Sequence, residues 1–145
     1  MKAANMFVGG WIIAAGLMPA ACSGAAEIAV IVSSKSPVSS ITPNQVADIF
    51  LARIATFPTG ARAVPIDQPE GSPVRDEFYE KTARKSVTQL RAYWLNLIFT
   101  GKGEPPVVAA DGEAVKRAVV NNPNAVGYIR TDLLDDSVKM LLLLP

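Results

Sequence analysis

The chain has 145 residues, one cysteine, no histidine and a formal net charge of +1, from 14 Lys+Arg and 13 Asp+Glu. This near-neutral balance without a basic run argues against nucleic acid as a partner. The lack of histidine removes the commonest general base and metal ligand. The sequence therefore predicts no catalytic residues, no metal site and no cofactor, and it favours a binding or interaction protein over an enzyme.

Residues 1–26 have the pattern of a secretory signal peptide: a positive start, an apolar run broken by glycines and Pro19, and small residues up to Ala26. We predict cleavage after Ala26, which leaves residues 27–145 as one periplasmic or secreted domain. The alternative is a lipoprotein signal that ends at Cys22, with a lipid anchor on that cysteine. Proline stands three residues before the cysteine, where such signals usually have leucine.

Caps and turn residues divide the remaining chain into strands and helices. The predicted elements, in chain order, are a strand at 27–34, a helix at 42–51, a strand at 62–67, helices at 72–83, 86–100 and 111–120, and strands at 125–130 and 138–144. Pro65 predicts that the second strand lies at a sheet edge or ends early. The mixture of strands and helices over one core predicts an α/β fold, a three-layer α/β/α sandwich with a mixed sheet.

The third predicted helix carries a stripe of apolar residues at helical spacing. Its members are Val87, Leu90, Trp94, Leu97 and Ile98. A stripe of this kind is typical of a helix face that packs against the core. We therefore expect all five side chains in the hydrophobic interior.

The stretch PEGSPVRDEFY starts a helix with Ser72 at the N-cap and places an arginine, Arg75, in the first turn. A cation there opposes the helix dipole by a few tenths to about 1 kcal/mol. One interpretation is an oxyanion bound by free N–H groups at Ser72 and its successors, by the serine hydroxyl and by the guanidinium. The other is an internal ion pair of Arg75 with Asp48 or Asp67. The sequence leaves both interpretations open.

Several stretches together resemble the short secreted proteins related to phosphate ABC-transporter substrate-binding proteins. They are AVIVSSKSPVSSITPNQVADIFLARIATFPTG, PEGSPVRDEFY, YWLNLIFTGKGEPP and NPNAVGYI. The resemblance runs across residues 27–144. It implies the fold of one lobe of a type II periplasmic binding protein, in a family whose full-length members hold phosphate between two such lobes.

The resemblance also implies a site at the start of the second helix. Gly71 and Ser72 match the family's phosphate-binding turn, but a Pro-Val pair replaces the Gly-Thr that follows it in the family. Asp67 or Gln68 stands near the position of the family's arginine. The site therefore keeps part of the family's pattern and lacks a hydroxyl and a cation.

These observations predict an anion site made up of Gly71, Ser72, Arg75 and Ser34, the last at the end of the first strand. Its ligand would be phosphate or a similar oxyanion, and the domain would serve ABC-type uptake or sensing, with an ABC permease or a membrane sensor as partner. One lobe offers half a site that is open to solvent, so tight binding requires a second copy or a partner to close over it. The alternative is an orphan lobe that acts as a periplasmic protein-interaction or regulatory module with no small ligand. An exposed apolar patch would favour this alternative.

Overall fold

The computed structural model describes residues 27–145, so the predicted signal peptide and its cleavage site lie outside the described residues. The strands are β1 (Ile28–Ser33), β2 (Val64–Asp67), β3 (Val107–Val108), β4 (Ala125–Arg130) and β5 (Val138–Leu144). The helices are α1 (Pro43–Phe50), α2 (Pro73–Ala83), α3 (Val87–Thr100) and α4 (Gly112–Asn121), with a 3-10 helix η1 at Thr131–Leu133. Within this part of the chain, no helix has the length and apolar character needed to cross a membrane.

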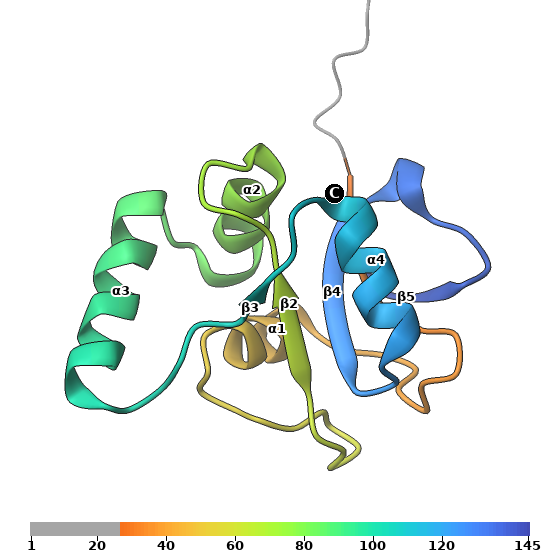
Figure 1. Cartoon of the computed structure of the whole chain (residues 1–145), viewed down its shortest axis with the longest axis horizontal. Coiled ribbons are helices and arrows are strands. Elements are labelled where there is room, and N and C mark those ends of the chain that lie inside the picture. Colours follow the sequence, from red (N-terminus) through yellow and green to blue (C-terminus); the bar gives the residue numbers. More distant parts are fainter. Residues whose placement is uncertain (1–26) are drawn as a thin grey trace, which may run out of the picture.

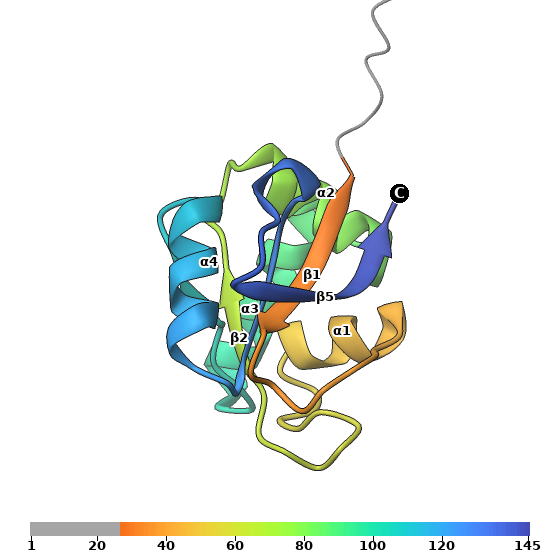
Figure 2. The ribbon, with the colours of Figure 1, turned by 90° about the vertical axis from the view of Figure 1, so that its right-hand side faces the viewer.

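The strands form one mixed sheet of five strands in the order β3-β2-β4-β1-β5. β2 is parallel to β3 and β4, whereas β1 is antiparallel to β4 and β5. Figures 1 and 2 show α4 on one face of the sheet and α1 and α2 on the other. This arrangement confirms the predicted three-layer α/β/α sandwich with a mixed sheet.

Each face of the sheet has its own hydrophobic cluster, because successive side chains of a strand point to opposite faces. On β1, Val30 belongs to the cluster under α1 and α2, and Ile31 to the cluster under α4. The two clusters fill the space between the sheet and the helices on each of its faces.

Side-chain caps set the helix boundaries close to the predicted positions. Thr42 and Ser86 both form capping boxes. In each box the glutamine three residues later, Gln45 or Gln89, accepts a hydrogen bond from the backbone amide of the capping residue. The Asp111 carboxylate accepts a hydrogen bond of 2.8 Å from the Ala114 amide and starts α4. Gly101 ends α3 in the left-handed conformation, with φ of +65°.

Two short elements were not predicted, and the position of β2 differs in part from the prediction. β3 and η1 contain two and three residues, too few to show a periodic pattern. β2 lies inside the sheet, between β3 and β4, although Pro65 predicted an edge or an early end. The proline is tolerated because β3 pairs only with Ile66 and Asp67, so one side of the strand stays open at Pro65.

The prediction that the whole apolar stripe of α3 lies in the core is wrong. Only Leu90 and Trp94 are buried, and Ile98 is 55% exposed. α1 and α2 already cover this face of the sheet, so α3 lies beside them at the margin of the molecule (Figure 1). A helix in that position has one covered side: Leu97 packs against the margin of the core cluster, whereas Leu95, Ile98 and Phe99 are exposed.

Gly127 allows α4 to pack directly on β4. A Cβ atom at this position would lie 2.4 Å from Val115 Cγ1 and 3.3 Å from Val119 Cγ2, both on α4. The first distance is shorter than real carbon contacts allow, so any side chain here must displace the helix or its valines. The glycine is therefore a packing requirement of the α4 layer.

We predict that Gly127→Ala lowers the free energy of unfolding by about 1–3 kcal/mol, because it overpacks a filled interface. Urea unfolding followed by circular dichroism measures this change. The double variant Gly127→Ala/Val115→Ala should lose less stability than the sum of the two single variants, because the smaller helix residue makes room for the new methyl group. Strictly additive losses would show that the two positions do not compete for the same space.

Candidate functional site

Asp67, the last residue of β2, is the centre of a buried polar cluster. β4 runs parallel to β2 and pairs Gly127 with Ile66, so the next residue of β4, Tyr128, lies beside Asp67. Side chains alternate between the faces, so Gly127 faces α4 whereas Tyr128 faces α2. The carboxylate is 2% exposed, and a charge in this position requires several partners.

Two tyrosines and a backbone amide supply most of these partners. Oδ2 of Asp67 accepts a hydrogen bond of 2.7 Å from the Tyr79 hydroxyl. Oδ1 accepts from the Tyr128 hydroxyl and, at 2.8 Å, from the Gln68 amide. Burial, reinforced by the charge of Asp67, raises the pKa of both phenols well above their usual range. Both hydroxyls therefore keep their protons and act as donors at any physiological pH.

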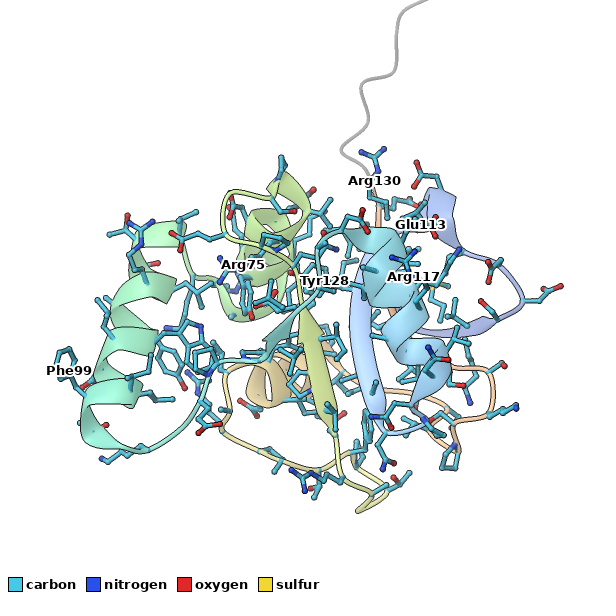
Figure 3. All side chains as sticks on the ribbon, viewed as in Figure 1. Arg75, Phe99, Glu113, Arg117, Tyr128 and Arg130 are labelled. Carbon is cyan, nitrogen blue, oxygen red and sulfur yellow. The ribbon has the colours of Figure 1, made fainter. Side chains whose placement is uncertain are left out.

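Arg75 completes the cluster from the first turn of α2. It precedes Tyr79 by four residues, so both side chains leave the helix on the same face. Its Nε lies 3.5 Å from Oδ2 of Asp67, and its guanidinium carbon lies 5.2 Å from the centre of the Tyr79 ring. Figure 3 shows Arg75 and Tyr128 close together in the middle of the molecule. Of the two acids proposed as internal partners, Asp67 pairs with Arg75, and Asp48 pairs with Arg53 at 3.4 Å.

The ion pair leaves hydrogen-bonding capacity on the arginine. Its side chain is 12% exposed, and its Nε is buried without a hydrogen-bond partner among the described residues. Arg75 also lines a hollow of about 270 Å³ between the start of α2, α3 and β3. The remaining lining residues are Gln68, Glu70, Val87, Arg91, Trp94, Leu95, Ile98, Pro105 and Val108. The internal ion pair and a space for a ligand are therefore both present.

Gly71 and Ser72 build the turn that leads into α2, but they expose fewer donors than the sequence predicted. Gly71 has φ of +92°, and the Ser72 amide bonds back to the carbonyl of Pro69 at 3.1 Å. The Ser72 hydroxyl accepts from the Arg75 amide and donates to Oε1 of Gln68 at 3.3 Å. The proline after Ser72 has no N–H, so the helix start is largely satisfied by the protein itself.

The structure does not bring Ser34 to this cluster. β1 is antiparallel to β4, and β4 is parallel to β2. The last residues of β1 therefore lie beside the first residues of β2, at one end of the strands. Asp67 and the turn before α2 lie at the opposite end, where β2 stops. Ser34 was placed in the site from its position at the end of the first strand, and the antiparallel direction of β1 puts that end away from the α2 turn.

A second ion pair lies at the rim of the hollow. Glu70 accepts from Nε of Arg91 at 3.0 Å, and both side chains are more than half exposed. The hydrogen bond and the positive charge of Arg91 lower the pKa of Glu70 below its usual value. Glu70 therefore stays ionised at neutral pH and balances the charge of Arg91.

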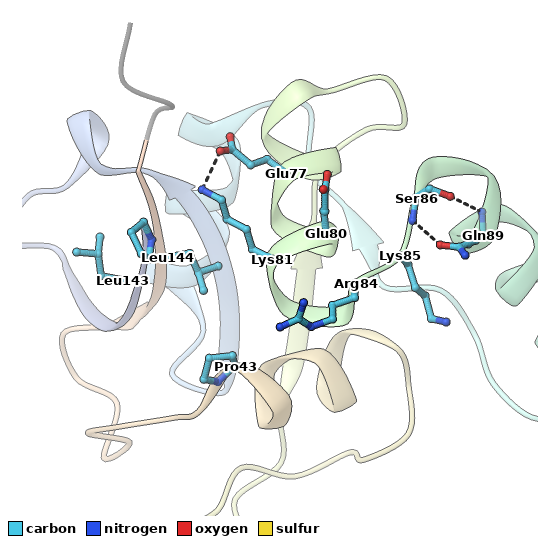
Figure 4. A pocket seen from close by; sticks show the side chains of 11 residues that line it. Pro43, Glu77, Glu80, Lys81, Arg84, Lys85, Ser86, Gln89, Leu143 and Leu144 are labelled. Carbon is cyan, nitrogen blue, oxygen red and sulfur yellow. Dashed lines mark hydrogen bonds and ion pairs between the residues drawn. The ribbon is translucent and has the colours of Figure 1, made fainter. Parts of the chain in front are cut away.

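A larger, open groove of about 890 Å³ lies between α2, the start of α3 and the end of β5 (Figure 4). It contains none of the predicted site residues. Its α2 wall carries the acids Glu77 and Glu80 and the cations Lys81 and Arg84, and Lys85 follows after the helix. Lys81 pairs with Glu77 at 2.8 Å, and the two acids weaken the attraction of this wall for an anion.

Sequence reasoning missed several residues of the site and found no metal ligands. Tyr79 and Tyr128 were part of resemblance motifs, but only the register between β2 and β4 shows that both reach Asp67. Arg91 and Trp94 reach the hollow because α3 lies at the margin of the sheet. In residues 27–145, no group of three or more His, Cys, Asp or Glu side chains could hold a metal ion.

Comparison with solved structures identifies the architecture. A structure described as a phosphate ABC-transporter substrate-binding protein with bound phosphate, from Clostridium perfringens, matches 80% of this chain with 27% identity and a TM-score of 0.62. An ABC-type phosphate transport receptor from Vibrio cholerae matches the same share with 21% identity and a TM-score of 0.62. No protein-family model and no curated protein matches the sequence.

The match covers 45% of the Clostridium protein and 47% of the Vibrio protein, so this chain spans less than half of their length. Both are described as binding proteins or receptors of transport systems. The mixed five-stranded sheet with its four helices corresponds to one lobe of such a protein. The chain is thus structurally related to phosphate ABC-transporter substrate-binding proteins, and it has the fold of one of their lobes.

Proposed function

We propose that this domain binds phosphate or a similar oxyanion in the hollow beside Arg75 and serves ABC-type uptake or sensing in the periplasm. The observation that carries the proposal is the guanidinium of Arg75, which lines that hollow and whose Nε, although paired by charge with Asp67 at 3.5 Å, makes no hydrogen bond among the described residues. The partner would be an ABC permease or a membrane sensor. Residues 1–26 would direct export, with cleavage after Ala26 or, alternatively, lipid attachment at Cys22.

The chemistry of Arg75 supports an oxyanion as the ligand. A guanidinium has five N–H donors in a planar fork that matches the oxygens of phosphate. The two carboxylate oxygens of Asp67 are already occupied by Tyr79, Tyr128 and the Gln68 amide. Asp67 therefore anchors the arginine through its charge and leaves most of the donors of the fork for a ligand.

The binding residues we propose are Arg75 as the main donor and Gly71 and Ser72 as the turn that positions it. Ser72 acts indirectly, because its hydroxyl is held by the Arg75 amide and by Gln68. Ser34 has no place in this site, since it lies at the other end of the sheet. The bound phosphate of the Clostridium neighbour supports the choice of ligand.

We expect phosphate to stabilise residues 27–145 against thermal unfolding. A ligand at 100 times its dissociation constant adds about 2.7 kcal/mol to the free energy of unfolding. Differential scanning calorimetry with phosphate, with sulfate and with chloride at equal ionic strength separates specific binding from screening. An unchanged melting temperature at tens of millimolar phosphate would contradict the proposal.

We expect Arg75→Lys to weaken phosphate binding roughly tenfold while the fold is kept. Lysine retains the positive charge beside Asp67 but lacks the planar fork, and a hydrogen bond to a charged group contributes about 1.5–3 kcal/mol. Isothermal titration calorimetry measures the affinity, and circular dichroism checks the fold. The matched control is Arg84→Lys at the other end of the same helix. A loss of affinity in the control would place the anion in the groove of Figure 4 instead.

A second candidate function, a protein-interaction module without a small ligand, is favoured by an exposed apolar patch. The patch consists of Leu95 and Ile98 on α3 and Val108 on β3, which line one hollow, together with Phe99, one turn after Leu95 on α3. Phe99 is 87% exposed and points away from the molecule in Figure 3. Contiguous exposed apolar surfaces mark interaction sites in soluble proteins. A second copy of the chain that docks here would also cover the hollow, because Leu95, Ile98 and Val108 line it.

If the patch joins two copies, sedimentation velocity will show concentration-dependent dimers of the wild-type protein. Phe99→Ser should weaken the dimer tenfold or more, because burial of a phenylalanine contributes about 1.5–3 kcal/mol. Met140→Ser, at an apolar position on β5 that is 44% exposed and lies outside the patch, serves as the control and should leave the dimer intact. A protein that stays monomeric up to millimolar concentration would rule out this second copy.

A further inference from the structure

We infer that the hollow beside Arg75 selects anions that carry an apolar substituent, such as organic phosphate monoesters, over inorganic phosphate. This inference rests on the proposed function, since it concerns the same site. It follows from three properties of the hollow: the composition of its walls, the small number of free donors and its size.

The walls of the hollow are mainly apolar. Six of its ten lining residues are Val87, Trp94, Leu95, Ile98, Pro105 and Val108. Leu95, Ile98 and Val108 are each more than half exposed, so their apolar surface is in contact with water when the hollow is empty of ligand. An apolar group in the hollow would remove that surface from water, which is favourable by about 25 cal/mol per Å².

Inorganic phosphate would find few partners here. All its oxygens need donors when it leaves water, because an anion that loses hydration without new hydrogen bonds is strongly disfavoured. The Gln68 side-chain amide already donates to the Tyr128 carbonyl at 2.9 Å, and Arg91 uses its Nε and one terminal nitrogen to bind Glu70. The donors that remain are the free N–H groups of Arg75 and Arg91, and among the described residues no third cation lines the hollow. A substituent on another oxygen removes part of the demand for donors.

Charge alone cannot supply the missing affinity. The hollow holds Arg75 beside Asp67 and Arg91 beside Glu70, so each cation has an acid next to it. The volume of the hollow is about 270 Å³. A bare phosphate would leave most of this space to water, whereas an ester with an aromatic or short aliphatic group would fill it.

The test compares inorganic phosphate, methyl phosphate, phenyl phosphate and phenol by isothermal titration calorimetry on residues 27–145. We expect the dissociation constant of phenyl phosphate to be at least tenfold lower than that of inorganic phosphate, with methyl phosphate between them. Tenfold corresponds to about 1.4 kcal/mol, or the burial of roughly 55 Å² of apolar surface at about 25 cal/mol per Å². Phenol should not bind measurably, because it lacks the group that Arg75 recognises.

Two exposed apolar positions provide the test variant and its control. Leu95→Ser makes the wall of the hollow polar and should remove most of the advantage of phenyl phosphate over phosphate. Met140→Ser, on β5 and outside the hollow, should leave the advantage unchanged. Leu95 is 51% exposed and Met140 is 44% exposed, so neither variant removes core packing.

The outcomes separate the inference from the proposed function. If phosphate binds and phenyl phosphate binds no more tightly, the inference is wrong and the proposed function stands. If neither binds, the proposed function fails and the inference fails with it. Equal binding of phenol and phenyl phosphate would also overturn the inference, because the apolar walls would then act without the guanidinium. An advantage that survives Leu95→Ser would overturn it as well, since the apolar group would lie elsewhere.

Discussion

The buried carboxylate of Asp67 is the interaction on which the arrangement of this domain depends. Asp67 is the last residue of β2, and its carboxylate accepts hydrogen bonds from the hydroxyls of Tyr128 on β4 and Tyr79 on α2. One carboxylate oxygen also lies 3.5 Å from Nε of Arg75. A charge this deeply buried is strongly destabilising if any main partner is lost. The requirement therefore ties α2 to the end of the two central parallel strands. Phe78, stacked on Tyr128 with ring centres 3.9 Å apart, adds apolar packing to the same junction.

The same junction leaves room for the binding role that we propose for Arg75. The carboxylate satisfies the charge of Arg75 at close range, but its oxygens are occupied by the phenols and the Gln68 amide. The guanidinium is thus held in position without being saturated by hydrogen bonds, and such preorganisation lowers the cost of binding a ligand. Of the two interpretations that the sequence left open, the structure contains the internal ion pair with Asp67, and the bound oxyanion is our proposal.

The position of α3 at the margin of the sheet gives the hollow its apolar walls (Figure 1). Leu95, Ile98 and Val108 are each more than half exposed around it. The hollow therefore combines one apolar wall with the guanidinium of Arg75. A site that binds a bare oxyanion would instead surround it with hydrogen-bond donors on all sides.

The sequence by itself determined the element boundaries, the fold class and the family resemblance, because caps such as Thr42 and Asp111 and the periodicity of β-branched runs are local signals. It also identified Arg75 as unusual from its place in the first helical turn. It did not determine that Asp67 meets Tyr79 and Tyr128, that Ser34 lies at the far end of the sheet, or that Ile98 is exposed. These facts depend on strand direction, on register and on which helix covers which part of the sheet. Such relations join residues far apart in the chain, and only the tertiary structure decides them.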